Sequence, residues 1–98
     1  MSQLHLKFTR VARAHLKSIG RYTEETWGIE QRDAYLGKLY VVCEMIRKSP
    51  HSGRIRDELY LGMLSKKAEK HIIYYFAEEN QIVIAGILHE RMEPSLHL

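Results

Sequence analysis

Residues 70–92, KHIIYYFAEENQIVIAGILHERM, decide the fold because they read as two apolar strands joined by a short polar turn. The segments HIIYYF and QIVIAGIL are rich in β-branched and aromatic residues, and AEEN between them is typical of a turn. They predict an antiparallel hairpin. Because IVIAGIL is apolar at every position, we expect this strand to lie centrally or covered on both faces, with Gly86 admitting a close neighbour.

Polar residues gather where this hairpin begins and ends. The start of one antiparallel strand lies beside the end of the next, so His71 should approach His89. A rigid pair of strands would hold such groups in place, as a binding site requires. The alternative is that these charges only keep the end of the sheet soluble. The predicted cluster comprises Lys66, Lys67, Lys70 and His71 before the hairpin, and His89, Glu90 and Arg91 after it.

The chain before the hairpin predicts a short strand and two helices. Apolar and polar residues alternate over 4–8, the period of a strand with one buried face. Thr9 can then cap a helix that Gly28 ends with a left-handed residue. A second helical pattern follows at once and ends before Pro50. Two helices joined this closely should form an antiparallel hairpin. The positions that share one helix side are Ala12, Leu16, Ile19 and Thr23, then Tyr35, Leu39, Val42 and Ile46.

The segment between the second helix and the hairpin is harder to divide. Residues 51–58 are polar and turn-like, whereas residues 59–64, LYLGML, suggest a short strand interrupted by Gly62. Residues 65–70, SKKAEK, suggest a loop or a widened turn. The predicted order is therefore strand, helix, helix and three strands (β-α-α-β-β-β), which belongs to the α+β class.

Length and composition favour one small globular domain over residues 1–98. The formal net charge of +3 favours acidic partners, without the dense basic field of a dedicated DNA-binding protein. A single cysteine, Cys43, excludes an intramolecular disulfide. We find no basic leader with a long apolar run and no stretch of eighteen apolar residues, so we expect a cytoplasmic protein without a membrane partner.

Motifs for catalysis or cofactor binding are missing from the sequence. The six histidines include no His-x3-His pair, and there is no Cys-x2-Cys. Cys43 lies mid-helix beside the apolar side, where a small buried residue is expected rather than a nucleophile. We also find no Gly-rich phosphate loop and no Gly-x-Ser-x-Gly elbow. These observations predict no metal, no cofactor and no recognised hydrolase or nucleotide-binding chemistry.

A stripe of cations follows the first helix at steps of three, four and four residues, roughly opposite its apolar side. Charged stripes of this kind are usually solvated surface. The alternative is a docking strip for an acidic segment of a partner. The members of this cation stripe are Arg10, Arg13, Lys17 and Arg21.

Over nearly its whole length the sequence resembles the ParE-type toxins of the RelE/ParE superfamily, from bacterial toxin–antitoxin pairs. The resemblance rests on Ala12, Leu16, Ile19 and Tyr22, on WG at 27–28, on SPHSGR at 49–54 and on KHIIYY at 70–75. The most specific motif is ILHERMEPSLHL at 87–98.

The resemblance implies a helical hairpin packed on a small twisted antiparallel sheet. It also implies an inhibitor of DNA gyrase that stabilises the cleaved-DNA state, acts by binding rather than as an enzyme, and is neutralised by a ParD-like antitoxin. The toxin would then form a hetero-oligomer with the antitoxin and meet operator DNA only through it. The cation stripe becomes the predicted antitoxin-binding surface. The predicted target-binding residues are Lys66, Lys67, Lys70, His71, His89, Arg91 and Met92.

Two alternatives remain open from the sequence. RelE-like toxins, the sister branch, cleave messenger RNA on the ribosome, and this chemistry needs a proton acceptor, a proton donor and cations. His89 keeps that option open, although no tyrosine follows Tyr75. The chain also has Leu64 where many ParE relatives carry the arginine of a Gly-x-Arg, and Glu93 where aspartate is common. A silenced toxin that is retained as an antitoxin-binding module is the second alternative.

Overall fold

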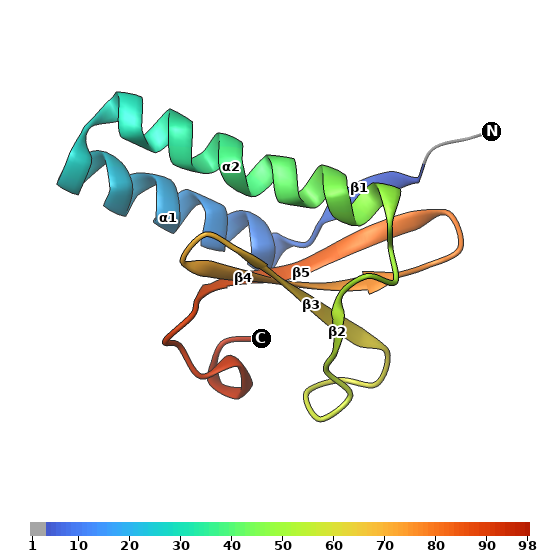
Figure 1. Ribbon diagram of the computed structural model, residues 1–98. Coiled ribbons are helices and arrows are strands. Elements are labelled where there is room, and N and C mark those ends of the chain that lie inside the picture. The colour runs from blue at the N-terminus through green and yellow to red at the C-terminus, as the bar shows by residue number, and fades with distance from the viewer. Residues whose placement is uncertain (1–3) are drawn as a thin grey trace.

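The computed structural model describes residues 4–98, in which two helices cover one face of a five-stranded sheet (Figure 1). The first three residues of the domain expected over 1–98 lie outside this range. In chain order the elements are β1 (His5–Phe8), α1 (Arg10–Trp27), α2 (Ile29–Lys48), β2 (Arg54–Ile55), β3 (Met63–Ala68), β4 (His71–Ala77), β5 (Gln81–His89) and the 3-10 turn η1 (Pro94–Leu96).

The sheet has the strand order β1-β5-β4-β3-β2. This arrangement confirms the α+β class and places the central strands β4 and β5 where the apolar runs predicted them. The expectation of a wholly antiparallel sheet was wrong, because β1 runs parallel to β5. Both helices and the strands β2, β3 and β4 separate β1 from β5 in the chain, so the connection is long enough for a parallel pair. The register pairs His71 with His89, as predicted.

The structure corrects the prediction between α2 and β4. Residues 59–62 form a turn rather than a strand, and β3 runs through Lys66 and Lys67, which we had assigned to a loop. The two-residue strand β2 also lies in the segment predicted to be a turn. Hydrogen bonds to β4 and β2 on either side hold β3 in place, and these outweigh the low strand propensity of its lysines.

Both helices begin and end as predicted. The Thr9 hydroxyl accepts a hydrogen bond from the Ala12 amide at 3.0 Å, and its own proton is donated to the Ala85 carbonyl at 3.2 Å. Thr9 therefore caps α1 and ties its start to β5. Gly28 alone joins α1 to α2, with φ of 96° and an extended ψ of 169°, so it is not the left-handed helical residue expected. A positive φ favours glycine here because it has no Cβ.

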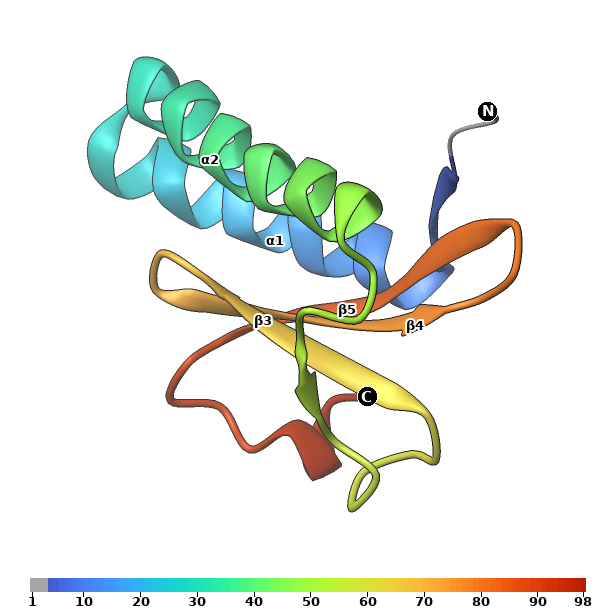
Figure 2. The ribbon, with the colours of Figure 1, turned by 45° about the vertical axis from the view of Figure 1, so that its right-hand side comes forward.

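The sheet has a core on each face. The helix-side core contains buried residues from both helices and from β3, β4 and β5, and it includes Cys43, as predicted. A smaller cluster of Met63, Tyr74 and Leu88 lies on the second face. Figure 2 shows that the β2–β3 connection and the chain after β5 lie on this second face. Leu98 packs directly against Gly86, which confirms that this glycine admits a close neighbour.

Candidate binding sites at the two ends of the helical hairpin

A hollow of about 720 Å³ lies between the tip of the helical hairpin and the adjacent end of the sheet. We call it the wedge pocket. In Figure 1 the tip of the hairpin extends past the sheet, above the β3–β4 turn and the end of β5. The residues that line the wedge pocket are Ser18, Ile19, Tyr22, Thr23, Trp27, Gln31, Tyr35, Lys70, His71 and His89.

One wall of the wedge pocket is aromatic. Trp27, the last residue of α1, is 69% exposed, and Tyr22, which lies earlier in the same helix, is 67% exposed. Because the sheet does not reach beneath the hairpin tip, these side chains have no apolar partner to cover them. The sequence analysis missed Trp27 as a site residue. The available signal was a large aromatic residue at the end of a helix, directly before Gly28.

The floor of the pocket consists of Tyr35, which is hydrogen-bonded to His71, and of His89, whose ring packs edge to face against that of His71. The Tyr35 hydroxyl accepts from the Lys70 amide at 3.2 Å and lies 2.6 Å from Nδ1 of His71. We assign the hydroxyl proton to the bond with His71, because the phenol then donates one hydrogen bond and accepts the other. His89 Nδ1 accepts from the Arg91 amide at 3.2 Å. The two imidazole rings lie 5.4 Å apart, centre to centre. In their neutral forms both histidines therefore carry the ring proton on Nε2.

Burial of His71 determines its charge. The pKa of His71 is lowered to about 4, mainly by removal from water and then by the neighbouring His89, while Glu90 opposes the shift. Burial also raises the pKa of the Tyr35 hydroxyl. At neutral pH the pair therefore consists of a neutral imidazole and a neutral phenol. Tyr35 had been assigned only to the apolar side of α2, so its hydrogen bond to His71 was not predicted.

The structure brings together only part of the predicted target-binding patch. Lys70, His71 and His89 line the wedge pocket, and Lys67 forms a 3.3 Å ion pair with Glu90 beside it. Lys66 instead donates to the Ser52 hydroxyl, in the turn before β2. The other two predicted target-binding residues, Arg91 and Met92, are exposed and lie outside the pocket lining.

Two shallower hollows follow the outer side of the hairpin. One lies where β1 meets α1 and includes Phe8 and Arg13, and the other lies along the seam between α1 and α2 and includes Lys17 and Arg21. All four residues of the cation stripe are exposed: Arg10, Arg13, Lys17 and Arg21. Members of the stripe thus line both hollows, and the hollow along the α1–α2 seam also contains Glu24, Glu25 and Asp33.

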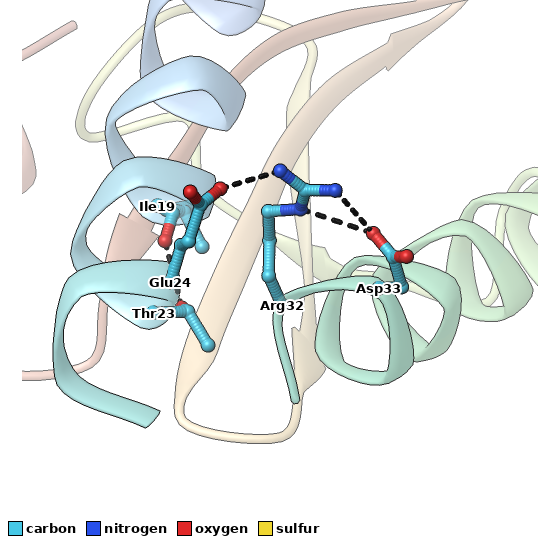
Figure 3. Close-up of polar contacts among 5 residues, drawn as sticks. All are labelled: Ile19, Thr23, Glu24, Arg32 and Asp33. Atoms are coloured by element: carbon cyan, nitrogen blue, oxygen red, sulfur yellow. Dashed lines mark hydrogen bonds and ion pairs between the residues drawn. The ribbon is translucent and has the colours of Figure 1, made fainter. Parts of the chain in front are cut away.

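Salt bridges close the outer seam near the hairpin tip. Arg32 of α2 contacts Glu24 of α1 and also pairs with Asp33 at 2.9 Å (Figure 3). On the same stretch of α1, the Thr23 hydroxyl donates to the Ile19 carbonyl at 2.7 Å (Figure 3). Of these contacts, the Arg32–Glu24 pair joins the two helices near the hairpin tip, whereas the other two lie within a single helix.

Other chemistry finds little support within residues 4–98. No group of three or more histidine, cysteine, aspartate or glutamate side chains in this range is placed to hold a metal ion. Burial raises the pKa of the Cys43 thiol to about 12, so it is a packed thiol and not a nucleophile. Across the described residues, no helix has the length and apolar character to cross a bilayer.

Two solved structures share this fold over most of their length. The chromosomal ParDE TA system from P. aeruginosa matches with a TM-score of 0.76 and 19% identity, over 89% of this chain and 96% of the other. The YoeB-YefM complex from Staphylococcus aureus matches with a TM-score of 0.57 and 16% identity, over 91% and 99% of the two chains. These likenesses define the fold class, a small α+β domain with a helical hairpin on one face of a mixed sheet.

Sequence comparison gives the family. The profile of the family described as "ParE toxin of type II toxin-antitoxin system, parDE" matches residues 6–94. Toxin ParE1 of Mycobacterium tuberculosis is 32% identical over 88 residues, covering 89% of this chain and 90% of the relative. Toxin ParE1 of Caulobacter vibrioides is 30% identical over 92 residues, covering 94% and 95%. The chain belongs to the ParE toxin family of type II toxin–antitoxin systems.

Proposed function

We propose that this ParE family toxin inhibits DNA gyrase by binding to it and is neutralised by a cognate ParD-like antitoxin. The observation that carries the proposal is the family match over residues 6–94, together with two ParE1 relatives that align over about nine tenths of their length. The toxin acts as a binding partner, consistent with exposed aromatic and basic surfaces and a buried, unreactive cysteine.

The antitoxin is expected on the outer flank of the hairpin. The cation stripe lies beside β1, which pairs only with β5 and therefore leaves one edge free. A free edge can add a strand from a partner, while the apolar groove around Phe8 can take its side chains. Acidic residues of the same segment would then pair with Arg13 and Lys17. The predicted product is a hetero-oligomer of toxin and antitoxin.

The runner-up function is ribosome-dependent cleavage of messenger RNA. It is favoured by the neutral His71 beside His89, since a neutral imidazole can accept the 2′-hydroxyl proton and a protonated one can donate to the leaving oxygen. Against it, His71 Nδ1 is already engaged by Tyr35, and the cluster contains one lysine, Lys70. The third possibility, a silenced toxin, follows from Leu64, whose side chain is packed in the helix-side core.

The decisive experiment incubates purified toxin with gyrase and supercoiled plasmid. After denaturation of the enzyme, linear cleaved DNA is expected to accumulate with toxin dose and to disappear when a matching antitoxin is added first. Uncut plasmid together with cut transcripts in a translation reaction would favour the ribonuclease instead. Uncut plasmid, intact transcripts and normal growth during unopposed expression would identify a silenced toxin.

A further inference from the structure

The aromatic wall of the wedge pocket has the composition of a protein contact site. Trp27 and Tyr22 are both about two thirds exposed and line the same hollow. Tryptophan and tyrosine are enriched among residues that dominate binding energy at interfaces, where they fill or frame pockets. Ile19 extends this apolar surface towards the sheet. The wall is thus suited to an apolar side chain of moderate size.

The opposite side of the pocket offers mainly hydrogen-bond donors. Nδ1 of His71 and Nδ1 of His89 are occupied by internal bonds, so each ring has an Nε2–H for a ligand. Lys70 adds an ammonium group, and within residues 4–98 no carboxylate forms an ion pair with it. Donors without matching acceptors favour a carboxylate ligand, since charge-assisted hydrogen bonds are the stronger ones.

We propose that the wedge pocket binds an acidic peptide segment of a protein partner, with an apolar side chain against Trp27 and Tyr22 and an adjacent carboxylate at Lys70 and His89. This inference rests on the proposed function in one respect, because it assigns binding rather than catalysis to this end of the molecule. It adds the kind of peptide that the wedge pocket binds, which membership of the family does not specify.

Charge argues for a peptide rather than for single-stranded RNA. An RNA strand needs a continuous basic groove in addition to aromatic stacking. The wedge pocket has one lysine, and Glu69 and Glu90 lie close enough to Tyr35 to act on its pKa. These carboxylates would repel a chain of phosphates, whereas one carboxylate of a peptide can be placed between Lys70 and His89.

The wedge pocket is also separate from the cation stripe. It lies on the sheet side of the hairpin, and none of its lining residues is shared with the two hollows on the outer flank. A segment bound at Arg13 and Lys17 therefore leaves the wedge pocket open, so the two surfaces can be tested independently.

Trp27 supplies the readout, because it is the single tryptophan of the chain. The full chain is titrated with a tryptophan-free peptide, Asp-Glu-Leu-Leu-Asp-Glu, with blocked ends. A saturable blue shift of the emission is expected as Leu covers the indole. The same peptide with Gly for Leu, and one with Lys for the acidic residues, should each bind at least about fivefold more weakly, because each lacks one half of the recognition. Equal binding of either peptide would overturn the proposal.

Matched variants locate the site, with fluorescein-labelled peptide anisotropy as the measurement. Lys70→Gln and Tyr22→Ala should each weaken binding by about fivefold or more, while Lys38→Gln and Val41→Ala, exposed residues of α2 outside the pocket, should leave it unchanged. Circular dichroism melts verify that all four variants fold. Loss of binding only in the control variants would overturn the proposal.

A single-stranded hexaribonucleotide is the third probe. If it binds more tightly than the acidic peptide, the pocket is a nucleic-acid site and the proposal fails. The gyrase cleavage assay is run in parallel on Tyr22→Ala. Peptide binding without any gyrase inhibition by the parent would refute the proposed function and leave the pocket assignment standing. Gyrase inhibition without peptide binding would do the reverse.

Discussion

At the scale of single residues, two histidines link the helices to the sheet through hydrogen bonds at Nδ1. His15 links α1 to β5, and His71 links β4 to Tyr35 of α2. His15 Nδ1 accepts the Ile87 amide proton at 3.1 Å, where β5 has already passed the end of β1. Burial, and secondarily the charge of His97, lowers the pKa of His15. His71 accepts from Tyr35 in the same way. A protonated Nδ1 would place two hydrogens against each other at His15, so both sites favour neutral histidine.

We therefore predict that the protein loses stability in mild acid. Because the pKa of His71 in the folded state is lowered from its ordinary value of 6.5 to about 4, the unfolded chain binds more protons between pH 6.5 and about pH 4. The free energy of unfolding should be full above about pH 6.5 and fall as the pH decreases through this window. Urea unfolding midpoints of the parent and of His71→Gln should be measured from pH 7.5 to 4.5.

His71→Gln should show a shallower decline, since glutamine can still accept from Tyr35 but does not titrate. The matched control is His51→Gln, which changes an exposed histidine and should follow the parent. Parallel pH curves for the parent and His71→Gln would show that His71 is not the residue responsible.

At the scale of elements, close contacts join the sheet to segments that lie outside it. A Cβ on Gly53 would collide with the Tyr75 hydroxyl and stand 2.8 Å from the Ser65 carbonyl oxygen. The same hydroxyl accepts from the Gly53 amide and donates to the Pro50 carbonyl. The turn after α2 is therefore locked to β4 by a buried tyrosine. At Gly86 the nearest obstacle is the end of the Leu98 side chain, and the His15 ring lies 3.3 Å away.

These contacts predict unequal effects of two Gly→Ala substitutions. Gly53→Ala should lower the free energy of unfolding by about 2–3 kcal/mol, because backbone and a core tyrosine must shift. Gly86→Ala should cost less than about 1 kcal/mol, because a flexible side chain near the end of the described chain can turn aside. Urea unfolding at pH 7.5 compares the two. A larger loss for Gly86→Ala would contradict the structure of this edge.

The exposed face of α1 carries the second prediction at this scale. Reversal of charge in the double variant Arg13→Glu, Lys17→Glu should slow association with the cognate antitoxin and flatten its dependence on salt, since steering by the stripe is lost. The double variant Lys38→Glu, Lys48→Glu makes the same charge change on exposed positions of α2 and serves as the control. Stopped-flow association at two salt concentrations measures both. Unchanged kinetics in the α1 variant would identify the stripe as solvated surface.

At the scale of the whole molecule, the fold separates a supporting sheet from the groups displayed at its end. The apolar β4–β5 pair is covered by helices on one face and by the chain after β5 on the other. His89 and Arg91 leave this support at the mouth of the wedge pocket, and Arg91 is exposed. Their loss should therefore affect the function of the toxin more than its stability.

The corresponding prediction concerns the double variant His89→Ala, Arg91→Ala. It should lose growth inhibition while its free energy of unfolding changes by no more than about 1 kcal/mol, as is usual for surface substitutions. The control, His51→Ala with Arg54→Ala, removes the same residue types from exposed positions near β2 and should keep both properties. Growth during induction and urea unfolding measure the two effects. Full toxicity of the His89, Arg91 variant would exclude this end of the sheet as the active surface.

Local pattern determined much of this protein. The periodicity of apolar residues predicts both helices, and Thr9 and Gly28 correctly mark where α1 begins and ends. The apolar runs predict the β4–β5 hairpin, and antiparallel geometry then brings His71 to His89. Each of these features depends on neighbours in the sequence or on a single short turn, so the residues involved carry the information themselves.

Only the tertiary structure decided the rest. The parallel pairing of β1 with β5, the extension of β3 through Lys66 and Lys67, and the uncovered aromatic wall at Trp27 arise between segments far apart in the chain. Each of these features depends on a distant segment of the chain. Hydrogen bonds from β4 hold β3 as a strand, and the wedge pocket is open because the sheet ends short of the hairpin tip. The local sequence of a segment carries no information about which distant segments will pack against it, so neither the mixed sheet nor the pocket could be predicted from residue pattern alone.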